Sequence, residues 1–137
     1  MGRAEDLWER LKSERIPAIE DLVVEQTVEE LFLDFKQSSD SGSGTKLSAD
    51  DRNNFAKAIS GFGNSEGGIV VWGVAAGPDA YGVDAANALK PVENAKRYEG
   101  RLQSAVSGCT IPPHTGVQNY SIAMPGSQHG FVVSYIT

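Results

Sequence analysis

The sequence at residues 54–74 reads NFAKAISGFGNSEGGIVVWGV. Its first part spaces Phe55, Ile59 and Phe62 at i, i+4 and i+7, which predicts the apolar face of an amphipathic helix. Its last part, residues 69–74, is a continuous apolar run, which is typical of a strand covered on both faces. We therefore expect a helix that leads through glycines into a buried strand, with the two elements sharing one core.

The glycines between these two elements invite comparison with a phosphate-binding loop. Such a loop leaves a strand and enters a helix, so that the helix N-terminus meets the phosphate. Here a helix leads into a strand, and no Gly-Lys-Ser/Thr motif is present. We expect instead a helix C-cap with close backbone packing and glycine at positive φ, and we predict no nucleotide cofactor.

Hydrophobic periodicity on either side predicts an α/β fold of the α+β kind, a mixed sheet flanked by helices. Residues 1–26 are expected to form a helical extension, with one helix over 4–15 and a second that Pro17 opens. Ser48 is the expected N-cap of the helix in the deciding stretch, with Asp51 at its third position. The other expected elements are strands at 31–36, 116–124 and 130–136, a helix from Pro91 to Val106, and loops at 37–45 and 75–90.

Composition limits the range of functions. The 137 residues fit one domain. The 12 basic and 18 acidic residues give a formal net charge of −6, which argues against coating nucleic acid by bulk charge but leaves room for a local basic patch. The single cysteine, Cys109, excludes an internal disulfide and indicates a reducing compartment. Because only His114 lies near it in sequence, we expect no zinc site.

No apolar run reaches about 18 residues, so we expect no membrane span. The N-terminus has no apolar signal core, and we expect a cytoplasmic protein. The chain stops at Thr137 within an apolar strand, which predicts a domain excised from a longer protein with further domains.

An acidic cluster at Glu29, Glu30 and Asp34 is the first candidate site. Neighbouring carboxylates can hold Mg²⁺ or Mn²⁺ for phosphodiester cleavage. On one ideal strand Glu30 and Asp34 lie about 13 Å apart, so convergence requires the chain to bend before Leu31. The alternative interpretation is solvated surface charge.

Six basic residues form the second candidate site, for nucleic acid. Each is expected on the surface of a helix or strand, away from the core. They are Lys36, Arg52, Lys57, Lys96, Arg97 and Arg101. If several gather on one face, they can contact about two to four phosphates. For the last three the alternative is an ordinary solvated helix face, where Glu93 pairs with Arg97.

Two segments together resemble the Schlafen-type AlbA-like domain. Residues 29–36, EELFLDFK, resemble its E-x-x-x-x-(E/D)-F-K element. Residues 54–74 resemble its second element, a helix ending in A-F-A-N-(S/T)-x-G-G followed by a strand ending in G-V. The resemblance covers residues 27–137. It implies a mixed-sheet fold and association with nucleic acid, often as the N-terminal domain of a bacterial transcriptional regulator or defence protein.

In vertebrate relatives of that family, paired lobes cleave tRNA or rRNA with three carboxylates. The resemblance maps two of them to Glu29 and Asp34. The third follows the G-V, where this chain has Ala75 and Ala76, and Asp79 lies farther along. This departure argues against cleavage.

Three hypotheses therefore remain open. The leading one is a non-cleaving nucleic-acid-binding module without a metal or other cofactor. The second is an endoribonuclease that uses Mg²⁺ or Mn²⁺. The third is a protein-interaction module, with a homodimer as one form.

Overall fold

The computed structural model describes residues 2–38, 46–63, 67–109 and 116–137. The expected α+β fold is confirmed. Residues 39–45 of the expected loop, and His114 of the excluded zinc site, lie outside the described ranges. The elements in chain order are α1 (Arg3–Glu14), α2 (Ile16–Val24), β1 (Leu33–Lys36), α3 (Ala49–Gly63), β2 (Gly68–Trp72), β3 (Val74–Pro78), β4 (Asp84–Leu89), α4 (Ala95–Cys109), β5 (Val117–Ala123) and β6 (Gly130–Ile136).

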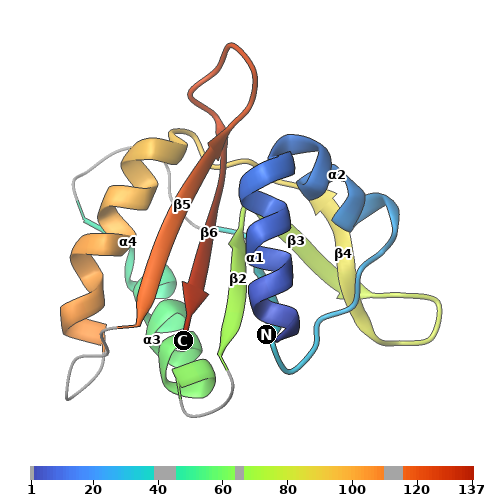
Figure 1. Cartoon of the computed structure of the whole chain (residues 1–137), viewed down its shortest axis with the longest axis horizontal. Coiled ribbons are helices and arrows are strands. Elements are labelled where there is room, and N and C mark those ends of the chain that lie inside the picture. The colour runs from blue at the N-terminus through green and yellow to red at the C-terminus, as the bar shows by residue number, and fades with distance from the viewer. Residues whose placement is uncertain (1, 39–45, 64–66, 110–115) are drawn as a thin grey trace.

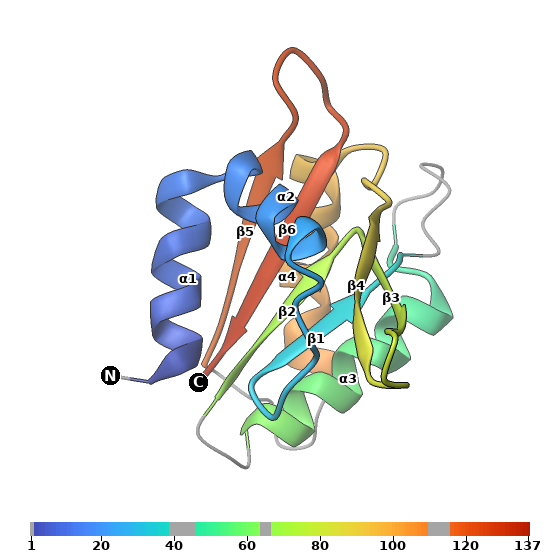
Figure 2. The same cartoon turned by 90° about the vertical axis from the view of Figure 1, so that its right-hand side faces the viewer.

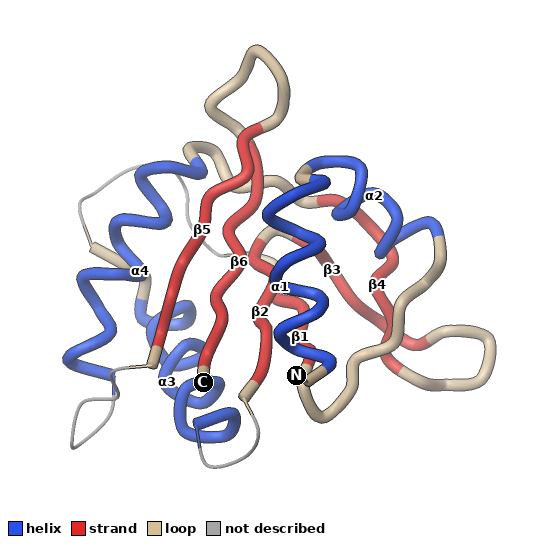
Figure 3. The backbone as a smooth tube through the Cα atoms, viewed as in Figure 1, coloured by secondary structure: helices blue, strands red, loops and turns tan. Residues whose placement is uncertain are grey.

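Four strands form a mixed sheet in the order β1-β2-β6-β5 (Figures 1 and 3). β1 runs parallel to β2, with Asp34 opposite Val70. β6 is antiparallel to both of its neighbours, β2 and β5. β3 and β4 pair with each other as a separate two-stranded ribbon. The apolar strand β2 therefore lies inside the sheet, as its continuous hydrophobicity predicts.

Helices cover both faces of this sheet (Figure 2). On one face, Phe55 and Ile59 of α3 pack with Val70 and Trp72 of β2 in one buried cluster, and Phe62 packs against it while partly exposed. This confirms the predicted core.

On the other face, α1 and α2 bury Trp8, Leu11 and Ile19 against Val71 and Val133 of the sheet. Both helices of the expected N-terminal extension thus contribute to the core of the same sheet. Among the described residues, no helix has the length and apolar character needed to cross a membrane.

Glycine at the end of α3 allows two close approaches. Gly67 has φ +95, and a Cβ there would lie 2.7 Å from the carbonyl oxygen of Ile136. A Cβ on Gly68 would lie 2.3 Å from Cγ of Phe62. Both contacts are too short for any side chain, so the predicted close packing of glycine is confirmed for these two residues.

The expected loop at 75–90 is wrong, because most of it forms the β3–β4 ribbon. Small residues such as Ala75, Ala76 and Ala86 have little strand propensity of their own. Their backbones are paired across the ribbon, and the ribbon is tied to the preceding segment by a bridge between Val28 and Ala85. Tertiary pairing, which propensity does not encode, decides this region.

Two expected element starts are also wrong. The helix predicted from Pro91 begins at Ala95, because Val92 exchanges two backbone hydrogen bonds with Gly130, of 2.7 and 3.0 Å. The strand predicted from Leu31 begins at Leu33. Leu31 is 95% exposed, since it lies in the turn that precedes β1.

Candidate functional site

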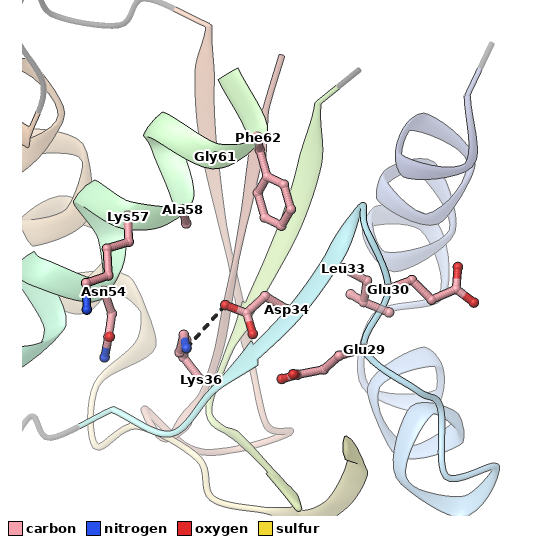
Figure 4. Close-up of a pocket in the computed structure, with 10 residues that line it drawn as sticks. All are labelled: Glu29, Glu30, Leu33, Asp34, Lys36, Asn54, Lys57, Ala58, Gly61 and Phe62. Carbon is pink, nitrogen blue, oxygen red and sulfur yellow. Dashed lines mark ion pairs between the residues drawn. The ribbon is translucent and has the colours of Figure 1, made fainter. Parts of the chain in front are cut away.

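A cavity of about 320 Å³ lies between β1 and α3, and we call it the β1–α3 pocket. Figure 4 shows the side chains from the two elements facing each other across it. Its lining residues are Glu29, Glu30, Leu33, Asp34, Lys36, Asn54, Lys57, Ala58, Gly61 and Phe62. The predicted acidic pair and two of the six predicted basic residues are thus brought to one place.

A tight turn brings the carboxylates together. Glu30 and Leu33 exchange two backbone hydrogen bonds, each of 3.1 Å. The chain therefore doubles back before β1, and Glu29 Oε1 accepts a hydrogen bond of 3.1 Å from the backbone N–H of Phe35. This is the bend that the sequence required for convergence with Asp34. The Glu30 side chain points instead toward α1, where it pairs with Arg3 (Figure 4).

The environment of Glu29, including Asp34, perturbs its carboxyl group. Burial, and then a hydrogen bond with Asp34, raise the pKa of Glu29 from 4.5 to about 7. The Phe35 N–H and the charge of Lys36 oppose this shift without cancelling it. Lys36 Nζ forms an ion pair of 3.3 Å with Asp34. Near pH 7 the carboxyl pair therefore holds about half a proton at Glu29, so its negative charge is smaller than two.

The opposite wall is one face of α3. Asn54, Lys57, Ala58 and Gly61 follow the i, i+3, i+4 and i+7 spacing of a helix face. Asn54 and Lys57 extend toward the side of the cavity that holds Lys36 (Figure 4). The sequence analysis identified Lys57 but missed Asn54, although its spacing from Lys57 is a signal that the sequence does contain.

The donor set does not match the three-carboxylate site implied by the Schlafen resemblance. Ala75 and Ala76 belong to β3, and neither lines the β1–α3 pocket. Asp79 Oδ1 accepts hydrogen bonds from the backbone N–H groups of Tyr81 and Val83, at 2.8 and 3.0 Å. Asp79 thus holds the turn between β3 and β4. Within the described ranges, no three Asp, Glu, His or Cys side chains are placed to hold one metal ion.

The six predicted basic residues fall into three groups rather than one patch. Lys36 and Lys57 line the β1–α3 pocket. Lys96 and Arg97 lie at the start of α4, where Lys96 pairs with Glu99 at 3.3 Å and the Arg97 N–H is accepted by the Asn94 side chain at 3.0 Å.

Arg52 and Arg101 line another cavity, of about 500 Å³, which we call the α3–α4 pocket. Its remaining lining residues are Lys46, Leu47, Ala49, Ser104 and Ala105. Arg101 is only 7% exposed, so the interpretation of its helix face as solvated is wrong at this position. Its part of α4 faces α3 instead.

Comparison of the chain with protein-family models, with curated proteins and with solved structures finds no match. The Schlafen resemblance therefore rests on the sequence motifs alone. The chemistry of the two pockets carries the functional conclusion.

Proposed function

We propose that this chain is a nucleic-acid-binding module that contacts the phosphate backbone through the β1–α3 pocket and does not cleave it. One observation carries the proposal, namely the joint placement of Lys36 and Lys57 beside the amide of Asn54 in one cavity. Ammonium groups bind phosphate as point charges, and an amide can donate to phosphate or to a base edge. The Schlafen resemblance supports the same function.

The charge balance of the pocket supports weak binding. The Asp34 carboxylate is offset by Lys36, and Glu29 is about half protonated near neutral pH. Glu30 points toward α1, and Lys57 is exposed at the rim. The net charge of −6 opposes approach of a polyanion. We therefore expect a Kd in the nonspecific range, about 10⁻⁴ to 10⁻⁶ M.

Fluorescence anisotropy with labelled duplex DNA, single strands and tRNA at several salt concentrations tests the proposal. We expect a log–log salt slope of about −2 to −4 for duplex DNA. The double variant Lys36→Ala/Lys57→Ala should make the slope shallower by about 1.8, since each phosphate contact contributes about 0.9.

The matched control is Lys12→Ala/Lys90→Ala, which removes the same charge outside both pockets. Equal effects of the two double variants would show that only bulk charge matters. The absence of binding at low salt would reject the proposal and favour an interaction module.

One observation favours a second candidate function, metal-dependent cleavage of RNA. Glu29 and Asp34 converge beside Lys36, and Mg²⁺ is often held by one or two carboxylates together with substrate phosphates. A bound Mg²⁺ or Mn²⁺ would stabilise negative charge on the phosphodiester. Glu29 would then have to lose its proton, and Lys36 would have to stay directed at the phosphate.

Incubation of tRNA with Mn²⁺ separates the two functions. The binding module leaves the tRNA intact, and calorimetry detects no tight Mn²⁺ site. Cleavage by the wild type that is abolished by both Glu29→Gln and Asp34→Asn would replace the first function with the second. Ala75→Asp or Ala76→Asp should strengthen Mn²⁺ binding if either position can supply the missing carboxylate.

A further inference from the structure

The α3–α4 pocket combines three cationic side chains. Lys46, Arg52 and Arg101 line it, and none of its described lining residues is acidic. This composition is opposite to that of the whole chain, in which acidic residues outnumber basic ones by 18 to 12. A cavity whose described charged side chains are all cationic is suited to an anionic ligand.

One hydrogen bond orients Arg52, and another joins the two helices that carry the arginines. The Arg52 guanidinium reaches across to α4, where Nη2 donates to the carbonyl oxygen of Gly108 at 3.1 Å. A Cβ on Gly108 would lie 2.6 Å from that Nη2, so a side chain at residue 108 would displace the guanidinium. Arg101 follows Tyr98 by one turn of α4, and the Tyr98 hydroxyl donates to the buried Asp51 of α3 at 2.8 Å.

The donors suit a phosphate group. A guanidinium has five N–H donors in a planar fork that matches the oxygen atoms of phosphate, and the contact with Gly108 uses one nitrogen of Arg52. Ser104 adds a hydroxyl group to the lining, and Lys46 adds an exposed ammonium.

The two pockets lie on different flanks of α3. Arg52 and Lys57 are five residues apart, which places them about 7.5 Å apart along the helix axis and about 140° apart around it. A helix with its side chains is about 10–12 Å across. A nucleic acid strand covers that distance with about three nucleotides at ~3.4 Å each.

We propose that the α3–α4 pocket is a phosphate-binding site, with Arg52 and Lys46 as its cationic ligands and Arg101 in its lining. If the bound phosphate is part of a nucleic acid strand that also occupies the β1–α3 pocket, the inference rests on the proposed function. If the ligand is free phosphate or a mononucleotide, the inference does not depend on that function.

Titration with inorganic phosphate, followed by amide chemical shifts in ¹⁵N–¹H spectra, tests the site directly. We expect saturable shifts at residues 46–52 and 101–105. Lys46→Gln/Arg52→Gln should weaken binding at least about tenfold, as expected for loss of one charge-assisted hydrogen bond. Arg101 is left intact because replacing this buried residue is expected to destabilise the fold.

The matched control is Lys12→Gln/Lys90→Gln, which removes the same charge outside both pockets and should leave the phosphate-induced shifts at residues 46–52 and 101–105 unchanged. Shifts scattered over all lysines and arginines, or equal loss in both double variants, would overturn the site. Acetate serves as a second control, since a carboxylate offers fewer acceptor oxygens than a phosphate does.

A single-stranded oligonucleotide identifies the source of the phosphate. If the strand crosses α3, Lys46→Gln/Arg52→Gln makes the salt slope shallower by about 0.7 for each lost contact. An unchanged slope, together with the phosphate shifts, assigns the site to a free phosphate or a mononucleotide. If the proposed function fails, the oligonucleotide does not bind at all while the phosphate shifts persist, so the two failures are distinguishable.

Discussion

The two flanks of α3 differ in how they carry charge. The β1–α3 pocket sets Lys36 and Lys57 against Glu29 and Asp34, whereas the lining of the α3–α4 pocket, as far as it is described, carries only cations among its charged residues. The first has a titrating group near pH 7, because the pKa of Glu29 is about 7. One helix therefore separates a pocket of mixed charge, which holds a titrating carboxyl group, from a pocket whose described charged side chains are all cationic.

The largest effect is expected from the residue that anchors this helix. Phe55 is fully buried and packs edge-on against Trp72, with ring centroids 5.9 Å apart. Phe55→Ala should lower the free energy of unfolding by about 3–5 kcal/mol and weaken ligand binding on both flanks. Urea unfolding measures the change. The control Lys57→Ala, at an exposed position, should stay within about 0.5 kcal/mol of the wild type; a Phe55→Ala melt like that of the wild type would contradict the shared anchor.

A smaller and one-sided effect is expected at the start of α3. The Ser48 hydroxyl accepts the backbone N–H of Asp51 at 3.2 Å, as the predicted N-cap requires. Ser48→Ala should cost about 1 kcal/mol. Because Arg52 lies in the first turns and Lys57 farther along, fraying should weaken phosphate binding in the α3–α4 pocket more than oligonucleotide binding in the other. Ser48→Asp, which can still cap the helix, is the control. Equal losses on both flanks would show that α3 responds as one rigid unit.

Two helical glycines allow the effect of helix stability on binding to be measured separately from the effect of pocket shape. A Cβ on Gly61 or on Gly100 meets no atom within 4 Å, and both residues lie inside helices. Alanine at either position should therefore stabilise the fold by about 0.5–1 kcal/mol. Only Gly61 lines the β1–α3 pocket, so only Gly61→Ala should also change oligonucleotide affinity. Identical binding by the two variants would place the bound strand away from Gly61.

A further effect is expected from pH. Folding raises the pKa of Glu29 from 4.5 to about 7, so between these values the folded chain holds more protons than the unfolded chain. The contribution of Glu29 to stability therefore falls as the pH rises from about 4.5 to 7. Glu29→Gln retains an oxygen for the Phe35 N–H, and its Tm relative to the wild type should be higher at pH 8 than at pH 4.

Oligonucleotide affinity should follow the same titration. As Glu29 loses its proton, its carboxylate repels phosphate, so wild-type binding should weaken a few-fold from pH 6 to pH 8 while Glu29→Gln stays flat. The exposed Glu25 provides the control Glu25→Gln, which should behave as the wild type. A pH profile that Glu29→Gln leaves unchanged would assign the titration to another group.

Much of the fold follows from local sequence patterns. The stripe of Phe55, Ile59 and Phe62 identified α3, and the continuous apolar run from Ile69 identified β2, because burial on one or two faces imposes a hydrophobic period on the sequence. Ser48 marked the beginning of α3 for an equally local reason, a side chain that accepts a nearby backbone N–H. The β3–β4 ribbon lacked such a signal, since its alanines are held by pairing across the ribbon rather than by preference.

The candidate sites show the same division. Sequence by itself determined which residues carry charge, that Glu29 and Asp34 could converge only after a bend, and which face of α3 carries Lys57. Only the tertiary structure decided that the bend at Glu30 is made, that the six basic residues divide among three places, and that Arg101 is buried between helices. The physical reason is that hydrophobic period and capping act within a few residues. Convergence of charges depends instead on strand order and helix packing, which join segments far apart in the chain.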